Sequence, residues 1–151
     1  MTTLAELENQ LPWGFHDAHI EGLTIDWLSQ TLKLVMRFPM SERQDIERRG
    51  EVTVSGLFFC SIEPPELGQP DFDDVPSEGL WIDGAEGIFK GVTGIPPVPA
   101  GVFLHHFWAR NWNGRTIHIA GLDASLRWLG EESGRVGSGG ALFPGDEIPD
   151  P

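Results

Sequence analysis

GVFLHHFWARNWNGRTIHIAGLDASLRW, residues 101–128, is the stretch that decides the fold. Two β-rich runs flank Asn113-Gly114, and Asn-Gly is the strongest short hairpin signal because both turn residues accept positive φ. A two-residue loop at this point predicts that Trp108 faces Ile119 across the hairpin. The arm that ends at Trp108 is apolar on both faces apart from two histidines, which is typical of a strand in the middle of a sheet.

The chain that precedes this hairpin predicts a short helix and a second hairpin. Thr3 to Gln10 has a capping threonine and is stopped by a proline, so it predicts one short helix. Ile20 to Leu28 alternates in polarity, but Gly22 interrupts the phase and predicts a β-bulge. Thr31 to Phe38 alternates without a break and predicts the partner strand.

The remaining segments complete an all-β pattern. The almost wholly polar run 41–49 predicts a solvated loop or an exposed helical turn, and Glu51 to Ile62 predicts a third strand. Short strands are expected at Leu80 to Ile82 and Ile88 to Val92, on either side of a turn at Asp83-Gly84. Trp27, Trp108 and Trp128 fall within strand patterns, which predicts that they belong to the core.

These elements predict a mainly β protein with one domain. About seven strands, with no helix long enough for parallel crossovers, favour an antiparallel sandwich or a partly open barrel with a short N-terminal helix. We expect the antiparallel domain to cover residues 1–130. Residues 131–151 are rich in glycine and proline and predict an extended C-terminal tail.

The charge of the chain narrows the classes of partner. Ten Lys and Arg against 23 Asp and Glu give a formal net charge of −13. Nucleic acids and anionic membranes attract positive surfaces, so neither is an expected partner, and a basic protein is favoured. No apolar run approaches the ~20 residues that a membrane-spanning helix needs. The N-terminus has no signal-peptide pattern, so a cytoplasmic location is expected.

An acidic segment is the candidate surface for a basic partner. It contains Asp71, Asp73, Asp74 and Glu78, and the run from Glu63 to Glu78 has no basic residue. Trp81 follows closely, and an exposed indole could anchor the partner. A solvated acidic loop, with the tryptophan packed at the rim of a sheet, is the alternative interpretation.

Five histidines raise the question of a metal site. In the predicted hairpin register, His118 shares a face with His105 but lies about 13 Å along it, too far for one ion. A site of His16, Asp17 and His19, completed by His105 or His106, would need a helical turn before the first strand. Hydrogen-bonded histidines at the end of a sheet are the alternative, and no cofactor is predicted.

The single cysteine and the absence of two common enzyme motifs indicate whether the chain is an enzyme. Cys60 lies in an apolar run, which predicts a buried, inert thiol, and one cysteine cannot form an internal disulfide. The glycine-rich run 134–140 lacks the ending of a phosphate-binding loop, and no nucleophile elbow occurs. The sequence therefore favours a non-enzymatic protein, without deciding the question.

The opening LPWGFHDAHI, residues 11–20, followed by a hairpin, resembles small uncharacterised bacterial proteins that include immunity-protein families of polymorphic toxin systems. The likeness covers about 30 residues. It implies an all-β cytoplasmic protein that binds and blocks a toxin domain, in which His16 and Asp17 fix the start of the first strand. The alternatives are a β-sandwich or barrel that binds a sugar or an apolar ligand, and a metal-dependent enzyme that uses His16, Asp17 and His19.

Overall fold

One short helix and nine strands make up the described part of the computed structural model, which covers residues 1–43, 45–63, 79–86, 97–109 and 116–134. In chain order they are α1 (Leu4–Asn9), β1 (His19–Asp26), β2 (Thr31–Pro39), β3 (Ile46–Ser55), β4 (Phe59–Ile62), β5 (Leu80–Glu86), β6 (Phe103–Ala109), β7 (Thr116–Gly121), β8 (Asp123–Trp128) and β9 (Ser133–Gly134). In these ranges no helix is long and apolar enough to cross a membrane.

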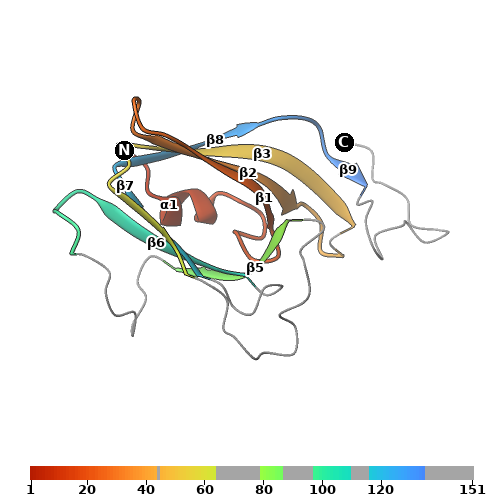
Figure 1. Ribbon diagram of the computed structural model, residues 1–151. Helices are drawn as coiled ribbons and strands as arrows, with labels where there is room; N and C mark the ends of the chain where they lie inside the picture. Colours follow the sequence, from red (N-terminus) through yellow and green to blue (C-terminus); the bar gives the residue numbers. More distant parts are fainter. Residues whose placement is uncertain (44, 64–78, 87–96, 110–115, 135–151) are drawn as a thin grey trace.

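The strands form one open antiparallel sheet that bends into two layers (Figure 1). Their order is β4-β7-β6-β5-β1-β2-β3-β8, and β9 pairs with β3 beside this path. Strand β5 pairs with both β1 and β6, so it joins the layers at one side. Only Leu122 separates β7 from β8, so the chain passes there from one layer to the other. The mainly β, antiparallel, partly open architecture confirms the predicted fold class.

The central hairpin is present, but its predicted register is wrong. Strand β6 lies between β5 and β7, as expected for an arm that is apolar on both faces. Trp108 pairs with Thr116 rather than with Ile119, a shift of three residues. The predicted turn at Asn113-Gly114 itself lies outside the described residues. Because the side-chain period of a strand is two, an odd shift also exchanges the faces on which the side chains lie.

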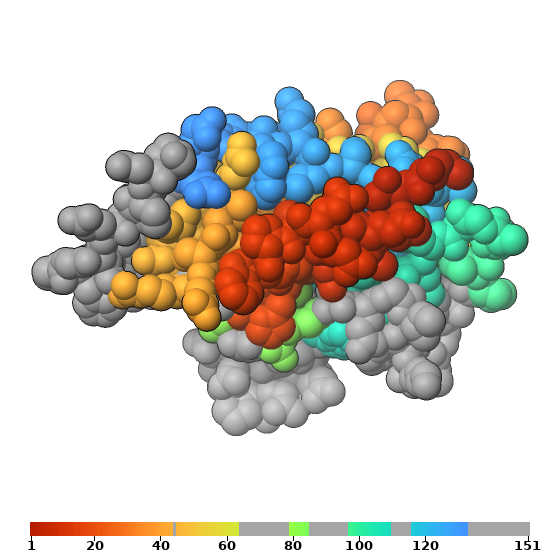
Figure 2. Space-filling view, turned by 180° about the vertical axis from the view of Figure 1, so that it is seen from behind, coloured from red at the N-terminus to blue at the C-terminus, as the bar shows by residue number. Residues whose placement is uncertain are grey.

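Local signals predicted the N-terminal half well. Thr3 caps α1 in a reciprocal capping box with Glu6, with distances of 3.1 and 2.8 Å. The register of β1 against β2 shifts between Ile20 and Gly22, which confirms the predicted bulge. Seen from behind, α1 crosses the open side of the bent sheet, with β8 above it (Figure 2).

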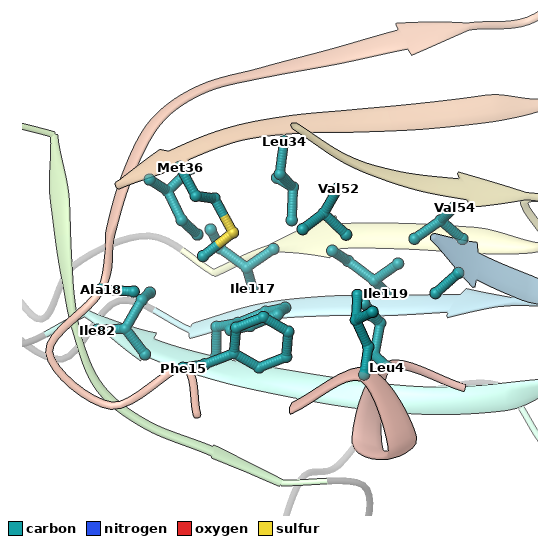
Figure 3. Close-up of a cluster of buried hydrophobic side chains, with 14 of the residues drawn as sticks. Leu4, Phe15, Ala18, Leu34, Met36, Val52, Val54, Ile82, Ile117 and Ile119 are labelled. Carbon is teal, nitrogen blue, oxygen red and sulfur yellow. The ribbon is translucent and has the colours of Figure 1, made fainter. Parts of the chain in front are cut away.

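The core lies between the two layers and is closed by the N-terminal segment (Figure 3). Leu4 and Leu7 of α1 and Phe15 of the following link are buried against it. The Phe15 ring contacts Phe107 edge-on, with ring centroids 5.1 Å apart. The helix is thus amphipathic, and its apolar side covers an opening that the strands leave.

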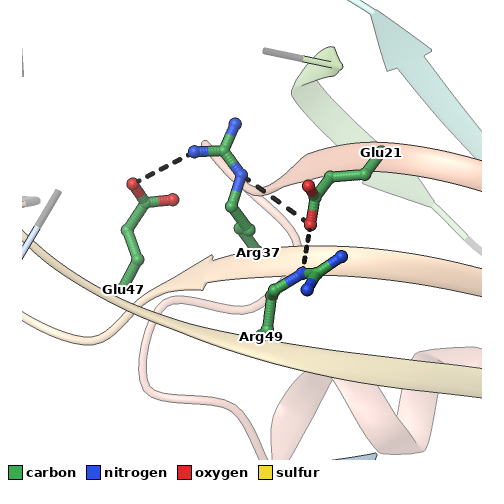
Figure 4. A network of polar contacts seen from close by, with 4 residues as sticks. All are labelled: Glu21, Arg37, Glu47 and Arg49. Carbon is green, nitrogen blue, oxygen red and sulfur yellow. Dashed lines mark hydrogen bonds and ion pairs between the residues drawn. The ribbon is translucent and has the colours of Figure 1, made fainter. Parts of the chain in front are cut away.

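Residues 41–49 correct a second expectation. Strand β3 begins at Ile46, and Ile46 and Glu47 are buried, so half of the predicted solvated loop belongs to the sheet. Charged side chains are tolerated there because they pair across strands (Figure 4). Arg37 lies between Glu47 and Glu21, at 3.5 and 4.0 Å, and Arg49 binds Glu21 at 2.8 Å.

The predicted third strand is two strands. Gly56 has a φ of +60° and separates β3 from β4, which belong to different layers. A left-handed residue between them lets the chain leave one layer and enter the other.

The predicted turn at Asp83-Gly84 is an irregularity within β5 rather than a reversal of the chain. The predicted strand at 88–92 lies outside the described residues.

Candidate functional site

The predicted ligand residues gather around one carboxylate. Asp17 accepts a hydrogen bond from the indole Nε1 of Trp81 at 2.8 Å, and its other oxygen lies 2.8 Å from Nδ1 of His16. Its backbone N–H donates to the carbonyl of Ile82 at 2.9 Å, and its φ is +64°. Aspartate is one of the few side chains that tolerate this conformation. Asp17 therefore fastens the start of β1 to β5.

His19 and Trp81 complete this arrangement from paired positions of β1 and β5. Their rings stack with centroids 5.9 Å apart and an interplanar angle of 16°, and His19 is buried. The side chain of His16, in contrast, is mostly exposed. Across the described ranges no three His, Cys, Asp or Glu side chains are grouped as metal ligands. The contacts of Asp17, His19 and Trp81 therefore have a structural role: they join the start of β1 to β5.

The predicted acidic surface cannot be placed. Asp71, Asp73, Asp74 and Glu78 lie outside the described residues. Trp81, the proposed anchor beside them, is half-buried, and its indole N–H is bound to Asp17. Its hydrogen-bonding group is thus used within the fold.

The histidines of the central hairpin meet, which the predicted register did not allow. His106 and His118 are directly paired in the β6–β7 ladder, and their Nδ1 atoms are 2.5 Å apart. Nε2 of His118 lies 2.9 Å from Oε1 of Glu63, at the end of β4. The result is a hydrogen-bonded series in which two buried imidazoles end at a carboxylate whose side chain is about half exposed. Both histidines were recognised in the sequence, but the predicted register, which was wrong by three residues, did not pair His118 with His106.

Burial sets the charge state of His106. It lowers the pKa of His106 to about 4, with further lowering by His118 and His105 and an opposing effect of Glu63. His106 is therefore neutral near pH 7.

His105, on the opposite face of β6, contacts the Phe15 ring, and its Nε2 is 3.7 Å from Glu8 of α1. The contact between His105 and Glu8 therefore connects α1 to the layer that contains β6.

The tip of the β1–β2 hairpin overturns the prediction that Trp27 is a core residue. Trp27 is 78% exposed and Leu28 is 100% exposed. Figure 1 shows this tip projecting beyond the neighbouring strands. Burying two such side chains stabilises a protein by about 2 kcal/mol each, so their exposure calls for an explanation.

The polar groups of the exposed tip form hydrogen bonds with one another. The Asp26 carboxylate accepts hydrogen bonds from the backbone N–H of Leu28 at 3.0 Å and of Ser29 at 3.3 Å. Hydrogen bonds from Ser29, above all from its backbone, hold the pKa of Asp26 below its ordinary value. A preorganised apolar tip loses little conformational entropy when it is covered by a partner.

Two neighbouring turns extend this surface. The N–H of Leu57 donates to the carbonyl of Gln30 at 2.8 Å, and the N–H of Leu122 donates to Ser55 at 3.0 Å. The β1–β2, β3–β4 and β7–β8 turns are thus bonded side by side. Each carries exposed apolar side chains, and we call this surface the turn face: Trp27, Leu28, Phe58 and Leu122.

A second apolar feature is a pocket of about 230 Å³ near the bulge of β1. It lies where Leu23 of β1, Leu80 of β5 and Ile117 of β7 approach Ile62, the last residue of β4. Ile62 is about half exposed although it shares a face with Cys60, which packs against the core. The pocket is therefore an extension of the core that opens to solvent.

Comparisons with models of protein families, with curated proteins and with solved structures find no match to this chain.

Proposed function

We propose that this chain is a non-enzymatic binding protein that docks a basic protein partner, and that the turn face is the centre of the contact. The observation that carries the proposal is the exposure of Trp27 and Leu28 on a turn whose backbone N–H groups bind the Asp26 carboxylate. Tryptophan is enriched among the residues that dominate binding energy, especially where it is preorganised.

The charge distribution supports a basic partner. Five of the ten basic residues lie on β2, β3 and β8, where most of them are paired with Glu21, Glu47 or Glu51: Lys33, Arg37, Arg48, Arg49 and Arg127. Arg48 instead lies over the Trp128 ring at 4.5 Å. Four of these five cations are thus paired with carboxylates within the fold, and the chain as a whole carries a net charge of −13. Charge of this sign accelerates encounter with a basic protein and disfavours acidic ones.

The specific form of the proposal is an immunity-like protein of the cytoplasm that covers a toxin domain. It is supported by the opening HDAH, in which Asp17 fixes the start of β1, the role that the resemblance implies for it. Such a protein blocks its partner by occupying a surface, and it needs no catalytic group of its own.

The test is affinity capture from the native host with matched variants. Trp27→Ser with Leu28→Ser removes the apolar tip and leaves Asp26 in place. Leu129→Ser is the control, because Leu129 is 40% exposed but follows β8, at the opposite end of β3. We expect one strongly basic protein to be captured by the native chain and by the control, and to be lost with the double variant.

Salt separates the contributions of charge and apolar contact. Raising the salt from about 0.05 to 0.5 M should slow association much more than it speeds dissociation. Capture of only neutral proteins, or equal capture by the double variant and the native chain, would refute the proposal.

A second candidate function is favoured by the pocket beside Ile62, which fits a small apolar molecule. Titration with fluorobenzene, followed by ¹⁹F NMR, is a direct test. Leu23→Trp should fill the pocket and abolish binding, whereas Leu129→Ser should not change it. Equal binding by Leu23→Trp and the native chain would exclude this pocket.

A further inference from the structure

A groove of about 360 Å³ runs between α1 and β8. Figure 2 shows the two elements side by side on this face. Its lining contains no charged residue: Thr2, Leu7, Gln10, Leu11, Ala124, Ser125, Leu126 and Trp128. Because β8 comes last in the order of the described strands, the groove follows an edge of this sheet.

Alternate residues of β8 direct their backbone groups into this groove. The N–H of Leu129 donates to the carbonyl of Arg49 at 3.0 Å, so the odd-numbered residues of β8 carry the hydrogen bonds to β3. The even-numbered residues therefore point their N–H and C=O groups away from β3. In the part of the chain that the structure describes, no backbone group pairs with Leu126 or Trp128 on that side.

One residue of this chain already pairs with the same edge. The N–H of Ala124, an even-numbered residue, donates to the carbonyl of Thr2 at 2.7 Å, and the N–H of Thr2 binds the Asp123 carboxylate at 2.7 Å. The main chain of Thr2 thus takes the first position along the edge. The chain then turns into α1, and the next two positions, at Leu126 and Trp128, are left open.

We propose that the groove binds an extended segment of a partner protein, which adds to the sheet as a strand beside β8. We exclude a second copy of this chain paired edge to edge, because α1 lies beside β8 and forms the opposite wall of the groove. Main-chain hydrogen bonds to Leu126 and Trp128 supply affinity, as in other strand additions.

The lining also defines the chemistry of the segment. Side chains on one side of the added strand face Leu7, Leu11 and the Trp128 ring, so apolar residues are required at alternate positions. No charged group lines the groove, so charged residues at those positions would lose their hydration without compensation. The groove shares no residue with the turn face, and this proposal stands without the previous one.

The test uses a phage library of random linear dodecapeptides, selected on the full chain, with the most enriched sequence made as a synthetic peptide. We expect alternating apolar residues in the enriched sequences. The peptide should shift the backbone amide resonances of Leu126 and Trp128 in ¹⁵N NMR spectra more than those of Ser125, whose N–H is bonded to β3.

Three variants examine the site. Gln10→Trp places a large side chain in the groove from an exposed position, and Leu126→Pro removes an outward N–H without removing a bond to β3. Gln10→Trp and Leu126→Pro should each weaken peptide binding at least tenfold, whereas Arg127→Ala, at an exposed position of β8 outside the lining, should change it less than twofold. If Leu126→Pro does not fold, Gln10→Trp decides alone. Unchanged binding by folded Gln10→Trp, amide shifts confined to other strands, or no enriched sequence would overturn the proposal.

Discussion

His106 and His118 stand opposite each other in the β6–β7 ladder, with their Nδ1 atoms 2.5 Å apart and both rings buried. The carboxylate of Glu63 lies at the other nitrogen of His118, 2.9 Å away. A carboxylate only accepts hydrogen bonds, so Nε2 of His118 carries a proton, and its Nδ1 is an acceptor in the neutral ring. Nδ1 of His106 is then the donor between the two rings.

The first prediction concerns these tautomers. We expect ¹⁵N NMR at pH 7 to show His118 protonated at Nε2 and His106 protonated at Nδ1. Glu63→Gln keeps a carbonyl acceptor and should preserve the pattern. Glu63→Ala leaves a buried N–H without this acceptor and should lower the free energy of unfolding by about 1–2 kcal/mol. The opposite tautomer of either ring would contradict the assignment.

The second prediction concerns acid stability. The pKa of His106 is about 4 in the folded chain, against 6.5 for an unperturbed histidine, because burial disfavours the charged ring. The unfolded chain therefore binds the proton first, and stability contributed by the neutral ring is lost as the pH falls from 6.5 towards 4. The loss is at most about 3 kcal/mol.

Urea denaturation of the native chain and of His106→Gln, at several pH values between 7 and 4.5, measures this effect. The native chain should lose more stability over this interval than the variant, since glutamine does not titrate. Parallel curves would show that His106 is not the group responsible.

The third prediction concerns Gly56, which joins the two layers. A Cβ at this position would lie 2.6 Å from Cδ1 of Leu122, and the φ of +60° disfavours any L side chain. Gly56→Ala should therefore destabilise the fold by about 1–3 kcal/mol in thermal or urea denaturation.

Variants at two other glycines separate the two causes of this loss of stability, the steric contact with Leu122 and the backbone strain. Gly101 has a φ of +86° and open space around its Cα, so Gly101→Ala reports backbone strain alone. Gly130 has open space and an ordinary φ, so Gly130→Ala should be neutral. Equal stability of the Gly56 and Gly130 variants would contradict the explanation.

The fourth prediction concerns Cys60. Burial raises the pKa of this thiol to about 11, so little thiolate is present at pH 8. Iodoacetamide should alkylate the native chain at least tenfold more slowly than the urea-unfolded chain. Equal rates would show that the thiol is reactive in the fold.

The sequence predicted the parts of the fold that depend on neighbours in the chain. Thr3 as a helix cap, the bulge at Gly22 and the hairpin of β1 and β2 all follow from interactions within a few residues. The run 41–49 was missed because it holds a single apolar residue, Ile46, and shows no period of two. Its second half, residues 46–49, belongs to β3, because β2 extends far enough to pair with this part of the chain.

The candidate sites were harder to predict, because each depends on residues that are distant in sequence. Asp17 and His19 were predicted as possible ligands of one site, whereas in the structure each contacts Trp81, which comes from another strand. The turn face was missed because alternation places Trp27 on the same side as Leu23 and Ile25, while the pairing of β1 with β2 ends at Asp26. A residue beyond the last pair has no facing layer to cover it.

The sequence by itself determined that this chain forms antiparallel β-structure with one capped helix, because turn chemistry and side-chain alternation act over a few residues. Only the tertiary structure decided the register of β6 against β7, and with it whether His118 meets His106 or lies far from His105. The reason is physical: a hairpin motif fixes the register only if the loop is tight. With a longer connection, contacts between whole strand faces and the core select the alignment.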